Sequence, residues 1–93
     1  MMMNNTLLNN IELIEEIEIV LNLYFSSFLK KESGYNFRCN ICGDSEKTKK
    51  KKRGWILTKY EEPIFYCHNC GQSLKAKNWL KKYFYNEYKE YLT

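Results

Sequence analysis

Large apolar residues recur at helical spacing through the first third of the chain. Positions 14, 17, 21, 24 and 28 are Ile, Ile, Leu, Tyr and Phe, and their alternating steps of three and four predict one face of an α-helix. We expect this helix to run from Thr6 to about Lys31, where Ser33-Gly34 supplies a stop signal. Its apolar stripe needs a cover, and two alternatives remain open: the rest of this chain, or a second copy or another protein.

The middle of the chain changes to short runs rich in aromatic and β-branched residues. GWILTKY (54–60) and PIFYC (63–67) are typical of strands, and the Glu61-Glu62-Pro63 sequence between them predicts a turn, so we expect a β-hairpin. Side chains alternate between the two faces of a strand, so only about half of them can face outward. Ile56 and Phe65 are expected in the core, and Trp55 and Tyr66 on the surface.

A second helix is predicted after the hairpin, from Ser73 to Leu92. Ser73 is a favourable N-cap, and the apolar and aromatic residues that follow gather on one broad face, with the lysines largely outside it. The expected organisation is an amphipathic N-terminal helix over residues 1–33, serving docking or oligomerisation, and a second unit over residues 34–93. The fold class is small α+β.

Length and charge narrow the possible functions. A chain of 93 residues supports one small domain, and its hydrophobic core alone is marginal. Residues 1–29 carry four glutamates and no Lys or Arg, whereas residues 30–93 carry all 15 basic residues against 7 acidic ones, which predicts a polyanionic partner for the basic part. The first residues lack the basic start of a secretory signal. Glutamates interrupt every apolar run before it reaches the length of a membrane span, so we expect no association with a membrane. We therefore expect a cytoplasmic protein (host cytoplasm if viral), in which thiols stay reduced.

Four cysteines can supply the missing stabilisation. They form two CxxC pairs, each followed by glycine: Cys39 and Cys42 in CNICG, and Cys67 and Cys70 in CHNCG. A CxxC turn brings two thiolates together, and the following glycine allows the chain to turn tightly. Four thiolates in a tetrahedral set favour Zn²⁺ and leave no open coordination position, so we predict one structural zinc ion. The expected fold is a metal-stabilised, four-cysteine zinc ribbon, with a short antiparallel sheet flanked by an N-terminal and a C-terminal helix.

Other interpretations of the cysteines fit less well. Two disulfides need an oxidising compartment, for which the sequence carries no signal. A redox CxxC motif sits at a helix start after a strand, which the doubled, glycine-followed pattern fits poorly. His68 is a rival ligand, but a ring next to Cys67 is expected to point away from a metal held by Cys67 and Cys70. Its alternatives are a solvent-facing or hairpin-packed imidazole and a contact with a ligand.

A basic block lies between the two cysteine pairs. Six of the seven residues at 47–53 are basic: Lys47, Lys49, Lys50, Lys51, Lys52 and Arg53. A zinc clamp would hold this block as a loop with anchored ends, and flat rings beside cations suit stacking on single-stranded nucleic acid. We predict that the block contacts single-stranded DNA together with Trp55, Tyr66 and His68. A solvated mobile loop and a nuclear localisation signal are the alternatives.

Three stretches of the sequence together resemble a known family. FRCNICGDS, KKRGW and FYCHNCG follow one another in the order and spacing of the N-terminal zinc-binding ribbon of tailed-bacteriophage DNA primases, over about residues 35–92. The resemblance implies that the four cysteines are zinc ligands. It also implies that His68 and the basic residues before Gly54 face the single-stranded template where a primer begins.

The resemblance does not extend to an enzyme. A chain of 93 residues cannot also contain the acidic, metal-binding catalytic domain of a primase. We therefore predict a module that is not an enzyme on its own and assists primer initiation in DNA replication, beside a separate primase catalytic subunit or replicative helicase. Homo-oligomerisation through the N-terminal helix is a further expectation. Two other classes stay open: a zinc-ribbon transcription factor or RNA polymerase accessory protein, and a zinc-stabilised protein-interaction adaptor.

Overall fold

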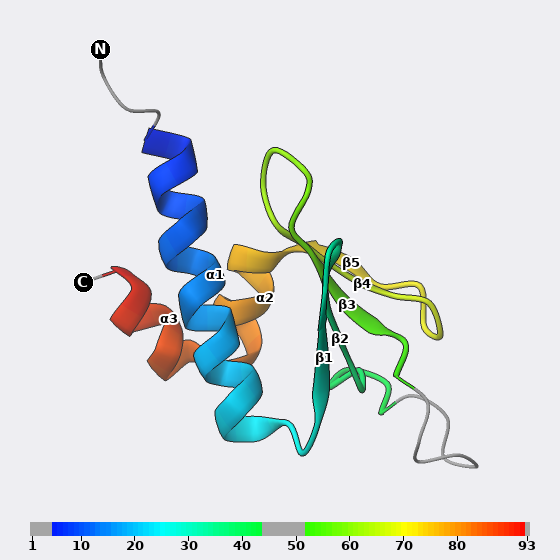
Figure 1. Cartoon of the computed structure of the whole chain (residues 1–93). Coiled ribbons are helices and arrows are strands. Elements are labelled where there is room, and N and C mark those ends of the chain that lie inside the picture. The colour runs from blue at the N-terminus through cyan, green and yellow to red at the C-terminus, as the bar shows by residue number, and fades with distance from the viewer. Residues whose placement is uncertain (1–4, 44–51, 93) are drawn as a thin grey trace.

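The computed structural model describes residues 5–43 and 52–92, which form one helix, five strands and two further helices (Figure 1). Helix α1 covers Asn5–Tyr24. The remaining elements, in chain order, are β1 (Phe28–Lys31), β2 (Gly34–Phe37), β3 (Gly54–Leu57), β4 (Ile64–Cys67), β5 (Ser73–Lys75), α2 (Ala76–Tyr83) and α3 (Tyr85–Leu92). The α+β class predicted from the sequence is confirmed.

The five strands form an antiparallel meander in the order β1-β2-β3-β4-β5, so every strand pairs with its neighbour in the sequence. The predicted hairpin is the β3–β4 pair, in which Trp55 lies opposite Tyr66 and Ile56 lies opposite Phe65. The sequence pattern predicted this central pair but not β1, β2 or β5 on either side of it. The hairpin is thus the middle of a wider sheet.

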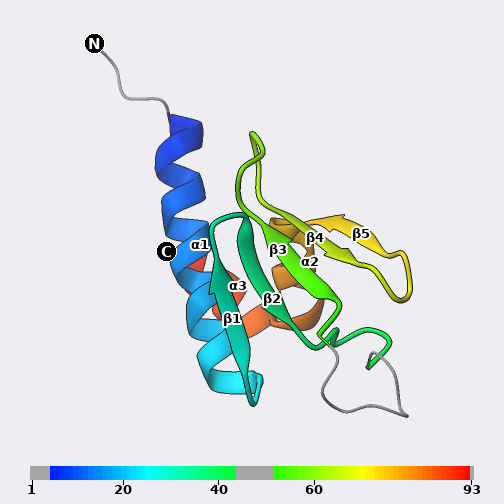
Figure 2. The same cartoon turned by 45° about the vertical axis from the view of Figure 1, so that its right-hand side comes forward.

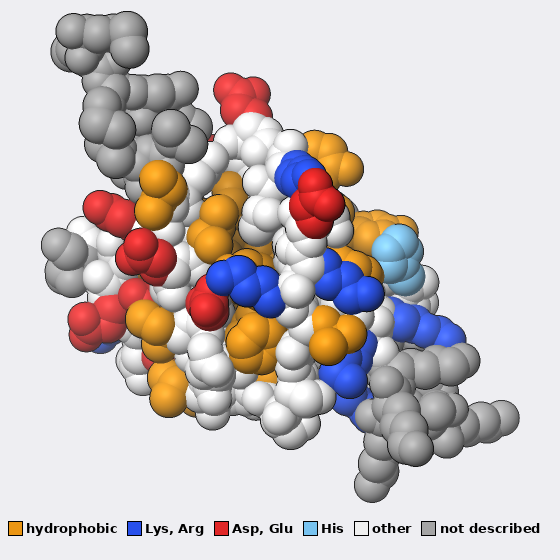
Figure 3. Space-filling view, viewed as in Figure 1, with side chains coloured by type: hydrophobic (Ala, Val, Ile, Leu, Met, Phe, Trp, Pro, Cys, Tyr) orange, Lys and Arg blue, Asp and Glu red, His pale blue; other side chains and the backbone are white. Residues whose placement is uncertain are grey.

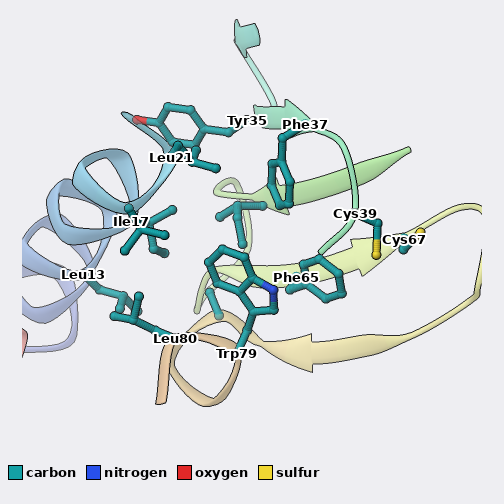
Figure 4. Packing of buried hydrophobic residues seen from close by; sticks show 13 residues of the cluster. Leu13, Ile17, Leu21, Tyr35, Phe37, Cys39, Phe65, Cys67, Trp79 and Leu80 are labelled. Carbon is teal, nitrogen blue, oxygen red and sulfur yellow. The ribbon is translucent and has the colours of Figure 1, made fainter. Parts of the chain in front are cut away.

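The three helices cover one face of the sheet and leave the other face uncovered (Figures 1 and 2). The core between the layers is built around Trp79 of α2, which is fully buried. Its ring stacks on Phe65 with centroids 5.5 Å apart and lies 5.7 Å from the ring of Phe37 (Figure 4). Ile56 and Phe65 are both fully buried, as the alternation along their strands predicts.

Helix α1 ends at Tyr24, so the prediction of a helix to about Lys31 is wrong. Residues 28–31 instead form β1, which pairs with β2 from Phe28 opposite Phe37 to Lys31 opposite Gly34. Ser26 and Ser27 lie at the change of direction, where serine side chains compete with helical hydrogen bonds. As an edge strand, β1 pairs with β2 on one side only, and this pairing folds the chain back over its own core.

The apolar stripe of α1 is covered by the rest of the same chain. Leu13, Ile17, Val20 and Leu21 are buried in the common core, and α1 lies against α3. The boundary expected between residues 33 and 34 falls in the turn between β1 and β2, inside a hairpin. No helix in the described part of the chain has both the length and the apolar character required to cross a membrane.

The C-terminal segment is not the single helix predicted from Ser73 to Leu92. Ser73 belongs to β5, and α2 begins after Lys75, whose side chain makes no capping hydrogen bond. A backbone bond from Ala76 N to Pro63 O, 2.9 Å long, lies at this start instead. The helix then breaks at Phe84, whose ring lies 5.1 Å from that of Trp79 and 5.2 Å from that of Tyr24. Partial burial of the Phe84 ring therefore accompanies the turn between α2 and α3.

Gly34 is required where β2 begins, and replacing it with alanine is expected to destabilise the protein by about 3 kcal/mol or more. Its φ is +144°, and an added Cβ would collide with the backbone carbonyl of Ile56 on the neighbouring strand. A backbone atom within a paired strand cannot move aside cheaply. Urea denaturation of Gly34→Ala should show the loss, with Ser33→Ala as the neighbouring control. A difference below 1 kcal/mol between the two variants would mean that the strands separate easily at this point.

Candidate metal centre and the open face of the sheet

The four cysteines meet at one end of the sheet. Cys39 and Cys42 lie in the turn after β2, and Cys67 and Cys70 lie at the end of β4 and in the turn after it. All four sulfur atoms lie within 4.8 Å of one another. Residues far apart in the sequence therefore form a single cluster that could hold a metal ion.

The two cysteine turns have the same backbone geometry. In the first, the N–H groups of Ile41 and Cys42 point at the sulfur of Cys39, at 3.3 and 3.5 Å. In the second, the N–H groups of Asn69 and Cys70 point at the sulfur of Cys67 at the same two distances. Each turn closes with a bond from the following glycine N–H to the carbonyl of its first cysteine, at 3.0 and 2.9 Å.

Both closing glycines have positive φ, 69° for Gly43 and 75° for Gly71. Side chains rarely adopt this conformation, which explains the glycine after each CxxC pair. Backbone N–H groups directed at sulfur stabilise thiolates over thiols. The two turns are thus preorganised to present negative sulfur atoms to a cation.

The sulfur separations fit a tetrahedral ion. Zinc–sulfur bonds of about 2.3 Å place neighbouring sulfur atoms roughly 3.8 Å apart in a tetrahedron. The sulfur atoms of Cys42 and Cys67, from different turns, are 3.7 Å apart. None of the four cysteines is joined to another by a disulfide. The donor set and its spacing therefore suit a four-coordinate, thiolate-bound metal.

The centre is buried on one side and open on the other. Cys39 and Cys67 are 2% and 0% exposed, whereas Cys70 is exposed. Burial raises the pKa of both the Cys39 and the Cys67 thiol, and the backbone N–H groups offset only part of that effect. Without a cation these two sulfur atoms would stay protonated at neutral pH. A metal ion must displace those protons to bind.

Metal affinity is therefore expected to fall steeply below neutral pH. If three to four protons leave on binding, the apparent association constant drops by about three to four orders of magnitude for each pH unit. For the metal-free fold the sign is opposite: raised thiol pKa values stabilise it below about pH 8.5, and this stability is lost as the pH rises further. Competition with a chromophoric chelator between pH 6 and 8 measures the first effect. A constant affinity across that range would contradict ligation by buried thiols.

One hydrogen bond ties the first cysteine turn to the core. The indole N–H of Trp79 donates to Oδ1 of Asn40 at 2.8 Å, and Asn40 lies between Cys39 and Cys42. A buried indole N–H without a partner would cost about 1–3 kcal/mol. The aromatic core and the first cysteine turn therefore hold each other in place.

The uncovered side of the sheet, called here the open face, displays aromatic side chains. The strand register places Leu29, Asn36, Trp55, Tyr66 and Ser73 in one row across it. Trp55 and Tyr66 are adjacent in this row and half-buried. Tyr66 also contacts the ring of His68 edge-on at 4.8 Å, and His68 is exposed. The expected surface positions of Trp55 and Tyr66 agree with this arrangement.

Cations lie at the edges of the open face. The ammonium of Lys31 sits 6.0 Å from the centroid of the Trp55 ring. Arg53 and His68 continue the β3–β4 ladder toward the cysteine cluster, because the N–H of His68 donates to the carbonyl of Arg53 at 2.9 Å. Lys52 is partly exposed and precedes Arg53. Lys47, Lys49, Lys50 and Lys51, also predicted to contact DNA, lie outside the described residues.

Charge is separated in space as it is in sequence. On the face shown in Figure 3, acidic side chains gather toward the helix side and basic side chains lie over the sheet. The acidic side is dense enough that neighbouring Glu90 and Glu87 add to the burial that raises the pKa of Glu16. A polyanion would therefore be attracted to the sheet side and repelled from α1, which carries four glutamates and no Lys or Arg; α2 and α3 together carry lysines as well as glutamates.

Sequence reasoning missed three residues of this region. Asn36 is 7% exposed, and its amide donates to the carbonyls of Lys52 and Gly54 at 2.9 and 3.0 Å, which fixes the backbone where the basic block enters β3. Lys31 was placed in a helix instead of beside Trp55. Asn69 contacts both a metal-ligand candidate and Arg53. Only Asn69 had a sequence signal, namely a polar residue inside a CxxC turn.

Comparison with known proteins does not assign the chain to a family or a function. The predicted relationship to the primase zinc ribbon therefore remains a prediction carried by the residues themselves. No protein-family model matches the chain, and no curated protein matches it.

Proposed function

We propose that this protein is a zinc-binding module that binds single-stranded DNA through the open face of its sheet. The observation that carries the proposal is the adjacent pair Trp55 and Tyr66 on an uncovered sheet face, with Lys31 and Arg53 at its edges. Rings at neighbouring strand positions can each stack on a base, and cations beside them can neutralise phosphates. Stacking suits unpaired bases, whose faces are accessible, better than a duplex.

The metal in this proposal is Zn²⁺ and its role is structural. Four thiolates complete the tetrahedral coordination of a zinc ion. The ion would cross-link the two cysteine turns and leave no coordination position for water or substrate. Cys39, Cys42, Cys67 and Cys70 would hold it. The β3–β4 hairpin with its two cysteine turns is then a zinc ribbon, and the ion fixes the end of the open face at which Arg53 and His68 lie.

The resemblance to phage primases suggests where such a module acts. We propose that it assists primer initiation beside a separate primase catalytic subunit or a replicative helicase, and that it has no catalytic activity alone. Lys52, Arg53 and His68 lie beside the two cysteine turns at one end of the open face, and this arrangement supports the role.

The test is a comparison of oligonucleotides at several salt concentrations. The zinc-loaded protein is expected to bind single-stranded DNA at least about tenfold more tightly than a duplex of the same length, because only unpaired bases can stack on Trp55 and Tyr66. The logarithm of the affinity should fall linearly with the logarithm of salt concentration, with a slope near −0.7 for each phosphate neutralised. Arg53→Gln should make that slope shallower by roughly one phosphate. Fluorescence anisotropy measures all three quantities.

Preference for duplex DNA would instead favour a transcription factor, and absence of binding to either would favour an adaptor. The adaptor has one observation behind it: Ile11, Ile19 and Leu23 are exposed at spacings of eight and four on the outer side of α1. The double variant Ile19→Ser with Leu23→Ser tests that surface without cutting into the core. Unchanged DNA affinity in this variant is expected if the open face is the binding site.

A further inference from the structure

The side chain of Asn69 bridges the metal centre and the open face. Its Nδ2 donates to the sulfur of Cys42 at 3.4 Å, and its Oδ1 accepts from Nη1 of Arg53 at 2.7 Å. Asn69 belongs to the second cysteine turn and Cys42 to the first. One amide therefore joins the two turns to each other and to the cation at the entrance of β3.

The chemistry of this bridge permits only one orientation. A guanidinium can only donate hydrogen bonds and a thiolate can only accept them. The amide oxygen must then face Arg53, and the amide nitrogen must face Cys42. An aspartate could not donate to the sulfur, and a serine at this position is too short to reach both groups. Asparagine is thus matched to a charged donor on one side and a charged acceptor on the other.

The backbone around Arg53 is held independently of this bridge. Asn36 donates to the carbonyls of Lys52 and Gly54, and His68 N–H donates to the carbonyl of Arg53. These bonds fix where the arginine side chain starts. The Asn69 contact acts further out, on the guanidinium itself, where a phosphate would be met.

We propose that Asn69 is a positioning residue that couples the metal centre to DNA binding by Arg53. With a metal holding Cys42 as a thiolate, the sulfur draws the amide N–H toward itself, and the amide oxygen holds the guanidinium with donors directed outward. This inference rests on the proposed function and adds that metal binding regulates the affinity for DNA. Coupling free energies are reciprocal, so a metal that strengthens phosphate binding at Arg53 must itself be bound more tightly when the phosphate is present. In this proposal the effect acts through the hydrogen bond at Cys42.

The test uses the protein loaded with Co²⁺, whose thiolate charge-transfer absorption reports on hydrogen bonds to the sulfur atoms. Saturation with a short oligothymidylate is expected to shift this absorption in the wild type. In Asn69→Ala the shift should disappear, and oligothymidylate affinity should fall about three- to tenfold. Zinc affinity should also fall by about tenfold, as is usual when a hydrogen bond to a ligand is removed. Asn69→Ser, with a turn-compatible residue, repeats the test should the alanine variant fold poorly.

The matched control is Asn40→Ala, which changes the asparagine of the first cysteine turn. Asn40 contacts Trp79 and not Arg53, so this variant should lose stability but keep the oligothymidylate-induced shift. Oligothymidylate that binds the wild type without any spectral change, or Asn69 variants with wild-type shift and affinity, would overturn the coupling while leaving DNA binding intact. Failure of the wild type to bind oligothymidylate would overturn both the coupling and the proposed function.

Discussion

Removing the proposed zinc ion with a chelator is expected to unfold the protein. A domain of 93 residues has a total stability of about 5–14 kcal/mol. Structural zinc in small domains contributes an apparent ~10–16 kcal/mol, which matches or exceeds that total. The loss should spread beyond the cysteine turns, because Asn40 links the first turn to Trp79 at the centre of the core. Thermal melts followed by far-UV circular dichroism, before and after chelation, should show the cooperative transition disappear and return when zinc is restored.

The sharpest variant for this prediction is Cys70→Ser. The Cys70 side chain is exposed, so in a fold without metal its replacement should change stability by no more than about 0.5 kcal/mol. If Cys70 is a metal ligand, the same change should cost several kilocalories per mole, because one of four bonds to the ion is lost. A Cys70→Ser protein as stable as the wild type, or a metal-free protein with an unchanged melt, would rule out a structural metal centre.

The sequence predicted those parts of the fold that follow from local patterns. The alternation in the runs GWILTKY and PIFYC identified which side chains point inward and located β3 and β4, although β3 ends at Leu57, before the end of the first run. The helical spacing of Ile17 and Leu21 likewise identified the buried side of α1. The spacing of apolar residues depends only on neighbouring positions in the sequence, so it predicts the buried side of a strand or helix without knowledge of the tertiary structure.

The boundaries that failed depend on contacts between distant residues. Phe28 continues the helical stripe of α1, yet it lies in β1 opposite Phe37, which is contributed by another strand. Phe84 lies inside a helical pattern, yet its ring stacks on that of the distant Tyr24, in α1, where the helix breaks. In both places a partner outside the local window outweighs a weak helix propensity. A local sequence pattern contains no information about such a distant partner.

The candidate metal ligands were predictable for a different reason. Two CxxC pairs followed by glycine describe two complete turns, and a turn that already directs its N–H groups at sulfur needs no information from elsewhere in the chain. The surroundings of the cluster were not predictable. Asn69 meets Arg53 through the register of β3 and β4, and Lys31 meets Trp55 through the registers of β1, β2 and β3. The ligand set is local, whereas its coupling to the open face is a property of the sheet.

Replacing Trp55 or Tyr66, which lie opposite each other on the open face, by leucine is expected to weaken single-stranded DNA binding strongly. Each lost stacking interaction costs about 1–3 kcal/mol, a factor of roughly 5 to 150 in affinity. Leucine keeps an apolar side chain on the strand, so the sheet should persist while the flat ring is lost. Because the two rings occupy adjacent strand positions, the change in binding free energy of the double variant is expected to differ from the sum of the changes in the two single variants.

The control for this experiment is Tyr60→Leu. Tyr60 is 58% exposed in the loop between β3 and β4, away from the Trp55–Tyr66 row, so its loss should leave DNA affinity within about twofold. Stacking and charge can then be separated by salt: ring variants should lower the affinity at every salt concentration and keep its salt slope, whereas Arg53→Gln should change the slope. Equal losses in Tyr60→Leu and Trp55→Leu would show that the rings do not bind bases individually. Binding would then follow from the charge of the sheet side alone, and the aromatic row would be a packing feature of the sheet.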